Sequence, residues 1–263
     1  MEEDVEALAR LAEDVARGAG DLLRTGLSRL RETVTTKTSD TDMVSEMDHA
    51  AEELIVSRLL EARPDDSILA EEGSGRSGSS AVRWVIDPLD GTTNYLYAHP
   101  AYAVSIAAEI EGEVAVGVVA DPSLDEVFTA VRGGGAFLNG EPISHSGQDD
   151  VATSLLATGF SYVAERRARQ AQVLARILST VRDIRRHGAA SLDLCWVACG
   201  RVDAYYEVGL EPWDIAAGAL IAAEAGALVS SIEGGPPSAA SVFAAAPAVG
   251  PALLALLAEA GAP

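Results

Sequence analysis

The chain has 263 residues, of which 48% are hydrophobic and 22% charged, a composition typical of a globular protein with room for one large or two modest domains. Its net charge of −21, from 40 acidic and 19 basic residues, opposes non-specific binding to nucleic acids, and no apolar stretch is long enough to span a membrane. The acidic N-terminus is unlike a secretion signal, so we predict a cytoplasmic protein.

Helical spacing of apolar residues predicts two helices near the N-terminus, over residues 4–30 and 45–60. A polar loop over residues 37–42 separates them. A short apolar run at residues 67–70 predicts a strand that leads directly into Glu71. This first part of the chain therefore delivers an acidic side chain to the end of a strand.

The middle of the chain has the pattern of consecutive strands. Residues 81–86 form an apolar, β-type run that is followed by Asp87 and Asp90. Three further strand-like runs come next, at residues 103–110, 114–120 and 126–131. Glycine and proline residues separate them, which favours an antiparallel meander.

From residue 151 onward, the pattern alternates between strand and helix, which is typical of an α/β fold. Strands are predicted at residues 154–158, 181–185, 202–206, 227–230 and 242–246, and helices at residues 165–178, 190–198, 213–225 and 251–260. We therefore predict a boundary in the polar stretch 144–150. It separates an α+β half, residues 1–150 with Asp48, Glu71, Asp87 and Asp90, from an α/β half, residues 151–263 with Glu207 and Asp214.

The most informative motif is residues 84–94, with the sequence WVIDPLDGTTN. Two carboxylates at a strand end are hard oxygen ligands that suit Mg²⁺. Pro88 restricts the backbone at Asp87, so that the Asp87 and Asp90 side chains can converge on one ion or an ion pair. Gly91 and the residues after it could offer backbone amides to an anion. Two aspartates with Pro and Gly also occur in ordinary turns, and the motif alone does not decide between the two readings.

Four further acidic residues are candidates for the same site. Glu71 follows a predicted strand, and Glu207 ends another. Asp214 stands at a predicted helix start, where an aspartate is often only an N-cap. Asp48 could equally be a solvated surface acid.

Six collinear motifs resemble those of the inositol monophosphatase family. Residues 84–94 resemble its first signature, and residues 213–218 (WDIAAG) with 224–226 (EAG) resemble its second. The other matching segments are residues 37–44 (KTSDTDMV) with Asp48, 70–73 (AEEG), 185–190 (RRHGAA) and 203–207 (DAYYE). Ala189 is a departure, because many relatives carry Ser or Thr there.

The resemblance implies a role for each matching residue. Glu71, Asp87, Asp90, Asp214 and the carbonyl of Leu89 match the ligands of Mg²⁺ in the family. Glu71, Thr92 and Asp48 match the residues that orient and deprotonate the attacking water. The matching substrate contacts are Lys37, Gly91, Thr92 and Thr93 for the phosphate, and Asp90, Ala190 and Glu207 for the polyol.

The resemblance also implies a layered αβαβα sandwich, an α/β fold of the sugar phosphatase type. The implied activity is Mg²⁺-dependent, lithium-sensitive hydrolysis of myo-inositol 1-phosphate or a similar polyol monophosphate, by a homodimer that binds neither nucleic acid nor membrane. Related branches hydrolyse fructose 1,6-bisphosphate, histidinol phosphate or 3′-phosphoadenosine nucleotides, and these substrates remain open. A non-enzymatic regulatory binding protein on the same fold is the less favoured alternative, because all four carboxylate ligands are present.

Overall fold

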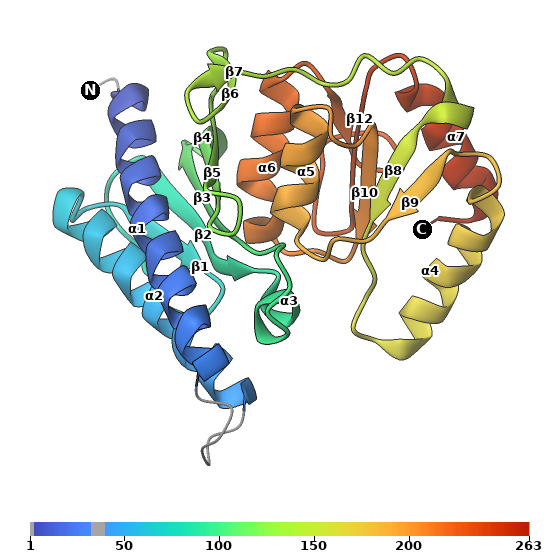
Figure 1. Ribbon diagram of the computed structural model, residues 1–263. Helices are drawn as coiled ribbons and strands as arrows, with labels where there is room; N and C mark the ends of the chain where they lie inside the picture. The colour runs from blue at the N-terminus through green and yellow to red at the C-terminus, as the bar shows by residue number, and fades with distance from the viewer. Residues whose placement is uncertain (1–2, 33–39, 263) are drawn as a thin grey trace.

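The computed structural model describes residues 3–32 and 40–262, with side chains described for residues 3–27 and 46–262. Helices and sheets stack in five alternating layers: a helix pair, a seven-stranded sheet, a second helix pair, a five-stranded sheet and a third helix pair (Figure 1). This arrangement is the αβαβα sandwich that the family resemblance implies. In the described ranges, no helix is apolar and long enough to cross a membrane.

The first helix pair consists of α1 (Val5–Glu32) and α2 (Asp40–Ala62), which cover one face of the seven-stranded sheet. The strands follow one another in chain order across that sheet, with β1 parallel to β2 and the remaining neighbours antiparallel. They are β1 (Ser67–Ala70), β2 (Val82–Asp90), β3 (Ala103–Ile110), β4 (Glu113–Asp121), β5 (Glu126–Val131), β6 (Gly135–Leu138) and β7 (Glu141–Pro142). The predicted meander is confirmed, and β6 and β7 extend it.

The second sheet has the strand order β11-β12-β10-β8-β9 and mixes parallel and antiparallel neighbours. Its strands are β8 (Leu155–Thr158), β9 (Asp183–Arg185), β10 (Ala204–Val208), β11 (Leu228–Ser230) and β12 (Ser241–Ala245). Helices α5 (Ala190–Ala198) and α6 (Pro212–Glu224) lie between the two sheets, and α4 (Ala164–Ile177) and α7 (Gly250–Ala260) cover the outer face. A short helix, α3 (Thr92–Leu96), and the 3₁₀ turn η1 (Val151–Thr153) complete the chain.

Strand alternation sends successive side chains into different cores. On β3, Val104 and Ile106 pack toward α1 and α2, whereas Ala103 and Ala107 pack toward α5 and α6. On β12, Val242 and Ala244 face α5 and α6, while Phe243 and Ala245 face α4 and α7. Since both sheets are covered on both faces, three apolar cores form between the five layers.

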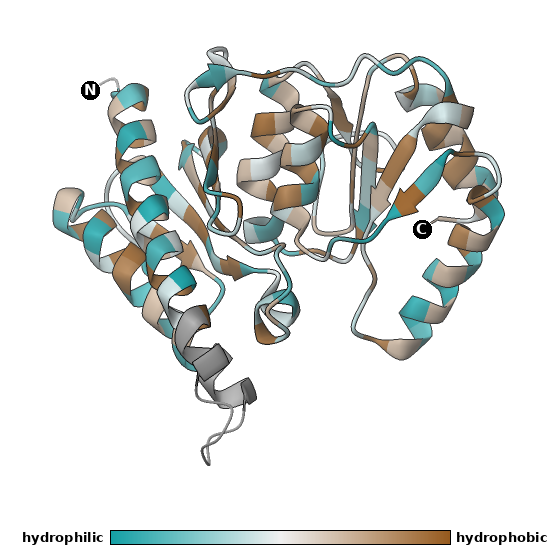
Figure 2. Ribbon diagram, viewed as in Figure 1, coloured by the Kyte–Doolittle hydropathy of each residue, from teal (hydrophilic) through white to brown (hydrophobic). Residues whose placement is uncertain are grey.

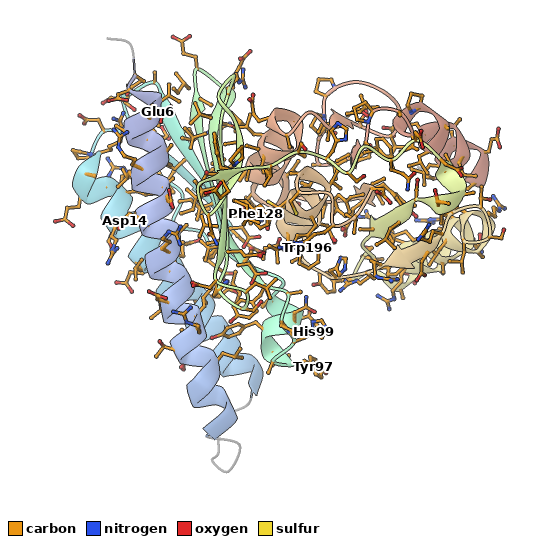
Figure 3. All side chains as sticks on the ribbon, turned by 45° about the horizontal axis from the view of Figure 1, so that its top comes forward. Glu6, Asp14, Tyr97, His99, Phe128 and Trp196 are labelled. Atoms are coloured by element: carbon orange, nitrogen blue, oxygen red, sulfur yellow. The ribbon has the colours of Figure 1, made fainter. Side chains whose placement is uncertain are left out.

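The central core joins the first sheet, the middle helices and the second sheet. Phe128 of β5 and Trp196 of α5 both belong to it and are labelled in Figure 3. Apolar residues recur along α5 and α6 in Figure 2, whereas α4 is largely hydrophilic. The middle helices are apolar nearly all round because sheets cover both of their sides.

Two sequence predictions about local structure need correction. The second helix begins at Asp40 rather than at residue 45, so Asp48 lies within α2 and not at its first turn. Strand β2 continues to Asp90, so both aspartates of the motif belong to the strand instead of following it. The predicted polar loop falls partly on residues 33–39, which lie outside the described residues. The domain boundary near residue 150 stays a prediction.

Candidate active site

A β-bulge brings Asp87 and Asp90 to the same face of the first sheet. Side chains three residues apart on a regular strand point to opposite faces. Here Asp87 pairs with Ser105 and Asp90 with Ala103, so three steps on β2 match two steps on β3. The extra residue of the bulge turns the Asp87 and Asp90 side chains to the same face of the sheet. Inside the bulge, the Leu89 amide donates a hydrogen bond of 3.0 Å to Oδ1 of Asp87.

Glu71 reaches the same place from the neighbouring strand. The parallel pairing of β1 with β2 puts Ala70 opposite Ile86, and the Glu71 amide donates to the Ile86 carbonyl at 3.3 Å. Glu71 therefore lies directly after the end of β1, beside Asp87 of β2.

Asp214 comes from the first turn of α6, which begins at Pro212. Its Oδ2 accepts a hydrogen bond of 2.7 Å from the Glu211 amide in a capping box. The N-cap residue is Glu211, so the N-cap role considered for Asp214 from the sequence is wrong, and Asp214 caps the helix from position N3 instead. Asp214 also faces β2. Carboxylate oxygens of Asp87, Asp90 and Asp214 all lie within 4.8 Å of one another, and these three residues form what we call the acid cluster.

The start of α5 holds Asp90 in position. Oδ2 of Asp90 accepts hydrogen bonds from the Ser191 amide at 2.8 Å and from the Ser191 hydroxyl at 2.5 Å. The Ala190 amide donates to Oδ1 at 3.3 Å. Asp90 is thereby fixed between the first sheet and the middle helix layer.

Burial and mutual repulsion make the carboxylates costly to ionise without a cation. Burial, followed by the charge of Asp214, raises the pKa of Asp90 to about 8. Burial is also the main reason that the pKa of Glu71 rises to about 7 and that the pKa of Asp87 lies well above its usual value. The pKa of Asp214 rises for the same reason. A group of hard oxygen donors with this excess of negative charge fits Mg²⁺.

The acid cluster lies at one wall of a cavity of about 340 Å³, which we call the acidic cleft. Glu207 and Arg186 also line this cleft, and Arg186 is the basic residue among the described residues that do so. The Tyr205 hydroxyl donates to Oε2 of Glu207 at 2.7 Å, and burial raises the pKa of Glu207 to about 7. Further lining comes from Leu89, Gly91, Thr92, Gly188, Ala190, Trp213 and residues 160–163 and 208–211.

The turn after β2 supplies Gly91, Thr92 and Thr93. Gly91 has a left-handed backbone (φ 86°) before α3, and a β-carbon there would lie 2.7 Å from the Ala101 carbonyl. The Thr92 hydroxyl donates to the Leu89 carbonyl at 3.1 Å. Thr93 does not line the cleft but contacts its rim, with Oγ1 at 3.4 Å from the Tyr162 hydroxyl.

Asp48 lies behind the acid cluster and does not line the cleft. It is buried, its Oδ1 has no hydrogen-bond partner among the described residues, and its pKa rises to about 8 through burial and the charges of Glu72 and Glu71. Nearby, the carboxylate of Glu52 accepts the amides of Glu72 and Ser74 at 2.8 and 2.9 Å, which fixes the turn after Glu71. Lys37 lies outside the described residues.

Sequence reasoning did not select four features of the cleft. Ser191 fixes Asp90, and Arg186 and the exposed Tyr162 line the cavity. Gly159 makes room for Glu207, because a β-carbon there would lie 1.9 Å from Oε2. A polar residue directly after the predicted contact Ala190 was the one available signal for Ser191. The remaining three depend on packing between segments distant in the chain.

Comparison with known proteins agrees with this geometry. The family model described as the inositol monophosphatase family matches residues 4–261. The protein named inositol-1-monophosphatase SuhB from Mycobacterium tuberculosis (strain ATCC 25618 / H37Rv) is 45% identical, with coverage of 95% of this chain and 93% of that protein. The protein named Nus factor SuhB from Escherichia coli (strain K12) is 41% identical, with coverage of 87% and 86%.

A solved structure described as Mycobacterium tuberculosis SuhB superimposes with a TM-score of 0.86 at 42% identity, and 99% of each chain is covered. The layered fold and the carboxylate-lined cleft are thus those of the inositol monophosphatase fold. The chain belongs to the inositol monophosphatase family and is a phosphoric monoester hydrolase.

Proposed function

We propose that this protein hydrolyses a polyol monophosphate, with myo-inositol 1-phosphate as the leading candidate, in a reaction that requires Mg²⁺. The observation that carries the proposal is the acid cluster itself, whose three carboxylates lie within 4.8 Å of one another in a cleft that Glu207 also lines. The first feature suits a metal-bound phosphate, and the second suits the hydroxyl groups of a polyol.

The residues proposed to hold Mg²⁺ are Glu71, Asp87, Asp90, Asp214 and the carbonyl oxygen of Leu89. When bound there, Mg²⁺ would neutralise the phosphate oxygens, lower the pKa of water and support the leaving oxygen. Its positive charge would also offset the burial and the repulsion that raise the pKa values of these carboxyl groups.

We propose that Thr92, Glu71 and Asp48 prepare the attacking water. The Thr92 hydroxyl donates a hydrogen bond to the Leu89 carbonyl. The lone pairs of the hydroxyl oxygen are therefore free to accept a hydrogen bond from the attacking water and to orient it. Glu71 is the carboxylate proposed to take the proton of that water. Asp48 is proposed to help Thr92 in this role, because the family resemblance pairs these two residues.

The remaining residues are proposed to bind the substrate. The backbone amides of Gly91, Thr92 and Thr93 and the side chain of Lys37 are assigned to the phosphate. Asp90, Ala190 and Glu207 are assigned to the polyol, because a carboxylate accepts hydrogen bonds from ring hydroxyls and repels a second phosphate. Arg186 on the same wall supports Glu207 by balancing part of its charge.

A phosphate-release assay over a panel of esters tests this proposal. With Mg²⁺, myo-inositol 1-phosphate should have a higher kcat/KM than glycerol 2-phosphate, fructose 1,6-bisphosphate, histidinol phosphate and a 3′-phosphoadenosine nucleotide. Chelation of the metal should abolish the activity, and Li⁺ should inhibit it where equal K⁺ does not. If one of the other esters proves best, the inositol assignment is wrong while the metal assignment stands.

The same assay distinguishes an enzyme from a regulatory binding protein. A relative carries the name Nus factor, and this chain has carboxylates at the four side-chain positions proposed to hold Mg²⁺. Absence of turnover for all esters, in protein that still binds Mg²⁺, would favour the regulatory alternative.

We also propose a cytoplasmic homodimer without nucleic-acid partners. Light scattering would test the oligomeric state, and a nucleic-acid binding assay would test the absence of such partners.

A further inference from the structure

The basic residues of this acidic protein are unevenly distributed. Seven of its 19 basic residues lie between positions 166 and 186, where Asp183 is the single acidic residue. Most arginines with described side chains bind a carboxylate or a backbone carbonyl. Within the described ranges, the arginines whose side chains have no hydrogen bond or ion pair are Arg10, Arg166, Arg169, Arg182 and Arg186. Four of these five lie between positions 166 and 186, which we call the basic segment.

Arg166 and Arg169 line a cavity of about 500 Å³ next to the acidic cleft. Together with Gln170 and Val173 they follow the spacing i, i+3, i+4, i+7, so they share one face of α4. Val173 and Val208 supply apolar surface, and Ala240 lies on another side. The cavity therefore combines an apolar interior with two guanidinium groups that have no partner in the described chain.

The guanidinium of Arg166 lies directly beside the end of β10. One of its terminal nitrogens is 3.7 Å from where a β-carbon would stand on Gly209. Ser161, Val208 and Gly209 line both this cavity and the acidic cleft, so the two sites share a wall but have different charge. The acid cluster and Glu207 belong to the cleft and not to this cavity.

A second apolar groove gives an internal comparison. It lies along α6 and also contains two arginines, Arg83 and Arg132. There, however, Arg83 pairs with Glu109 at 2.5 Å and Arg132 pairs with Glu113. Its positive charges are already neutralised, so an anion gains little by binding in that groove.

We propose that the cavity beside α4 binds a small anion with an apolar body, such as an aromatic or alkyl carboxylate, sulfonate or phosphate. The anionic group pairs with Arg166 and Arg169, and the apolar body packs against Val173, Val208 and Ala240. This site is separate from the proposed Mg²⁺ site and is independent of the substrate assignment.

Two fluorescent probes test the proposal. The first is 1-anilinonaphthalene-8-sulfonate, an aromatic sulfonate, and the second is N-phenyl-1-naphthylamine, its uncharged counterpart. We expect wild-type protein to bind the sulfonate at one site. The double variant Arg166→Gln/Arg169→Gln should bind the sulfonate at least about tenfold more weakly and bind the neutral probe unchanged, because only the charge-assisted hydrogen bonds are lost.

The matched control is Arg10→Gln/Arg182→Gln, which removes the same charge from two exposed, unpaired arginines outside the cavity. It should bind both probes like the wild type, as should Asp90→Asn, which alters only the acidic cleft. Ala240→Trp should weaken both probes by filling the cavity. Equal sulfonate affinity in the two double variants would overturn the proposal, and so would loss of sulfonate binding in Asp90→Asn.

Discussion

At the scale of single residues, Asp90 connects more parts of the molecule than any other carboxylate of the cleft. Its side chain accepts three hydrogen bonds from α5 and lies in the acid cluster. Asp90→Asn keeps the shape but removes a proposed charged ligand, so we expect kcat/KM to fall by at least about 100-fold, beyond the usual loss for residues that only support metal ligands.

Steady-state kinetics with a Mg²⁺ titration measures this effect. Asp183→Asn is the control, because Asp183 is an exposed acid that pairs with Arg185 on β9. It should retain full activity. If Asp90→Asn reached wild-type turnover at saturating Mg²⁺, Asp90 would not be a metal ligand.

The Thr92 hydroxyl should matter for turnover rather than for binding. Thr92→Ala removes the group that donates to Leu89 and that we assign to the water, but it keeps the backbone amide. We expect kcat to fall by roughly 10²–10⁴-fold with little change in KM. Thr92→Ser should restore most of the rate. A raised KM with unchanged kcat would contradict this role.

Glu207 should determine how well the protein recognises a polyol. Glu207→Ala should reduce kcat/KM for myo-inositol 1-phosphate much more than for glycerol 2-phosphate. A charge-assisted hydrogen bond contributes roughly 1.5–3 kcal/mol, which corresponds to about 10- to 150-fold. The ratio of the two kcat/KM values is the quantity to compare.

Gly159 provides a second variant for the same prediction. Gly159→Ala would force the Glu207 carboxylate to move, because the new β-carbon would lie within 2.1 Å of both of its oxygens. It should lower the inositol-to-glycerol ratio while leaving Glu207 in the chain. Equal losses of kcat/KM for both esters in both variants would show that Glu207 does not recognise the polyol.

At the scale of elements, the position of Asp214 depends on how closely α6, the helix that carries it, packs against strand β4. A β-carbon on Gly117 of β4 would lie 2.7 Å from the backbone carbonyl oxygen of Ala217 in α6. Gly117→Ala therefore separates the strand from the helix that carries Asp214, and overpacking of this kind costs about 1–3 kcal/mol. We expect both the free energy of unfolding and the affinity for Mg²⁺ to decrease.

Urea denaturation and Mg²⁺ titration measure the two effects. Gly75→Ala is the control, since a β-carbon there would approach nothing closer than 3.7 Å and the loop is exposed. It should leave both quantities unchanged. A Gly117→Ala protein with normal stability and normal metal affinity would show that this approach does not position α6.

The sequence predicted most elements because their periodicity is local. Strands β6 and β7 were missed, since four and two residues are too few to show a pattern. The metal-ligand candidates could be named from motifs, but their convergence depends on the bulge in β2 and on α6 docking over that strand. Ser191 contacts Asp90, which is 101 residues away in the chain, and Gly159 makes room for Glu207, which is 48 residues away. Local sequence patterns do not show contacts over such separations.

At the scale of the whole molecule, the raised pKa values make stability depend on pH and metal. Folding raises the pKa of Asp48 and Asp90 from 3.8 to about 8, and of Glu71 and Glu207 from 4.5 to about 7. The folded protein thus holds more protons than the unfolded chain between about pH 4 and 8, so its stability falls as pH rises through that window.

Thermal unfolding in EDTA and in excess Mg²⁺, at several pH values from 5 to 8, tests this dependence. Without metal, Tm should decrease toward pH 8. The increase in Tm caused by Mg²⁺ should become larger over the same range, because the metal replaces the protons that are lost. A metal-free Tm that rises between pH 5.5 and 8 would contradict the prediction.

The layered path of the chain also has a consequence for how the protein is made. Asp214 follows Asp90 by 124 residues, so during synthesis the first two acids of the cluster leave the ribosome well before the third. At typical rates of roughly 5–20 residues per second, that delay lasts about 6–25 s. For most of this interval the nascent chain has strand β2 but not α5, which holds Asp90, and throughout it lacks the complete α6, which supplies the third acid. The proposed metal site is therefore a late product of synthesis, and a chain that terminates before Asp214 lacks one of its proposed ligands.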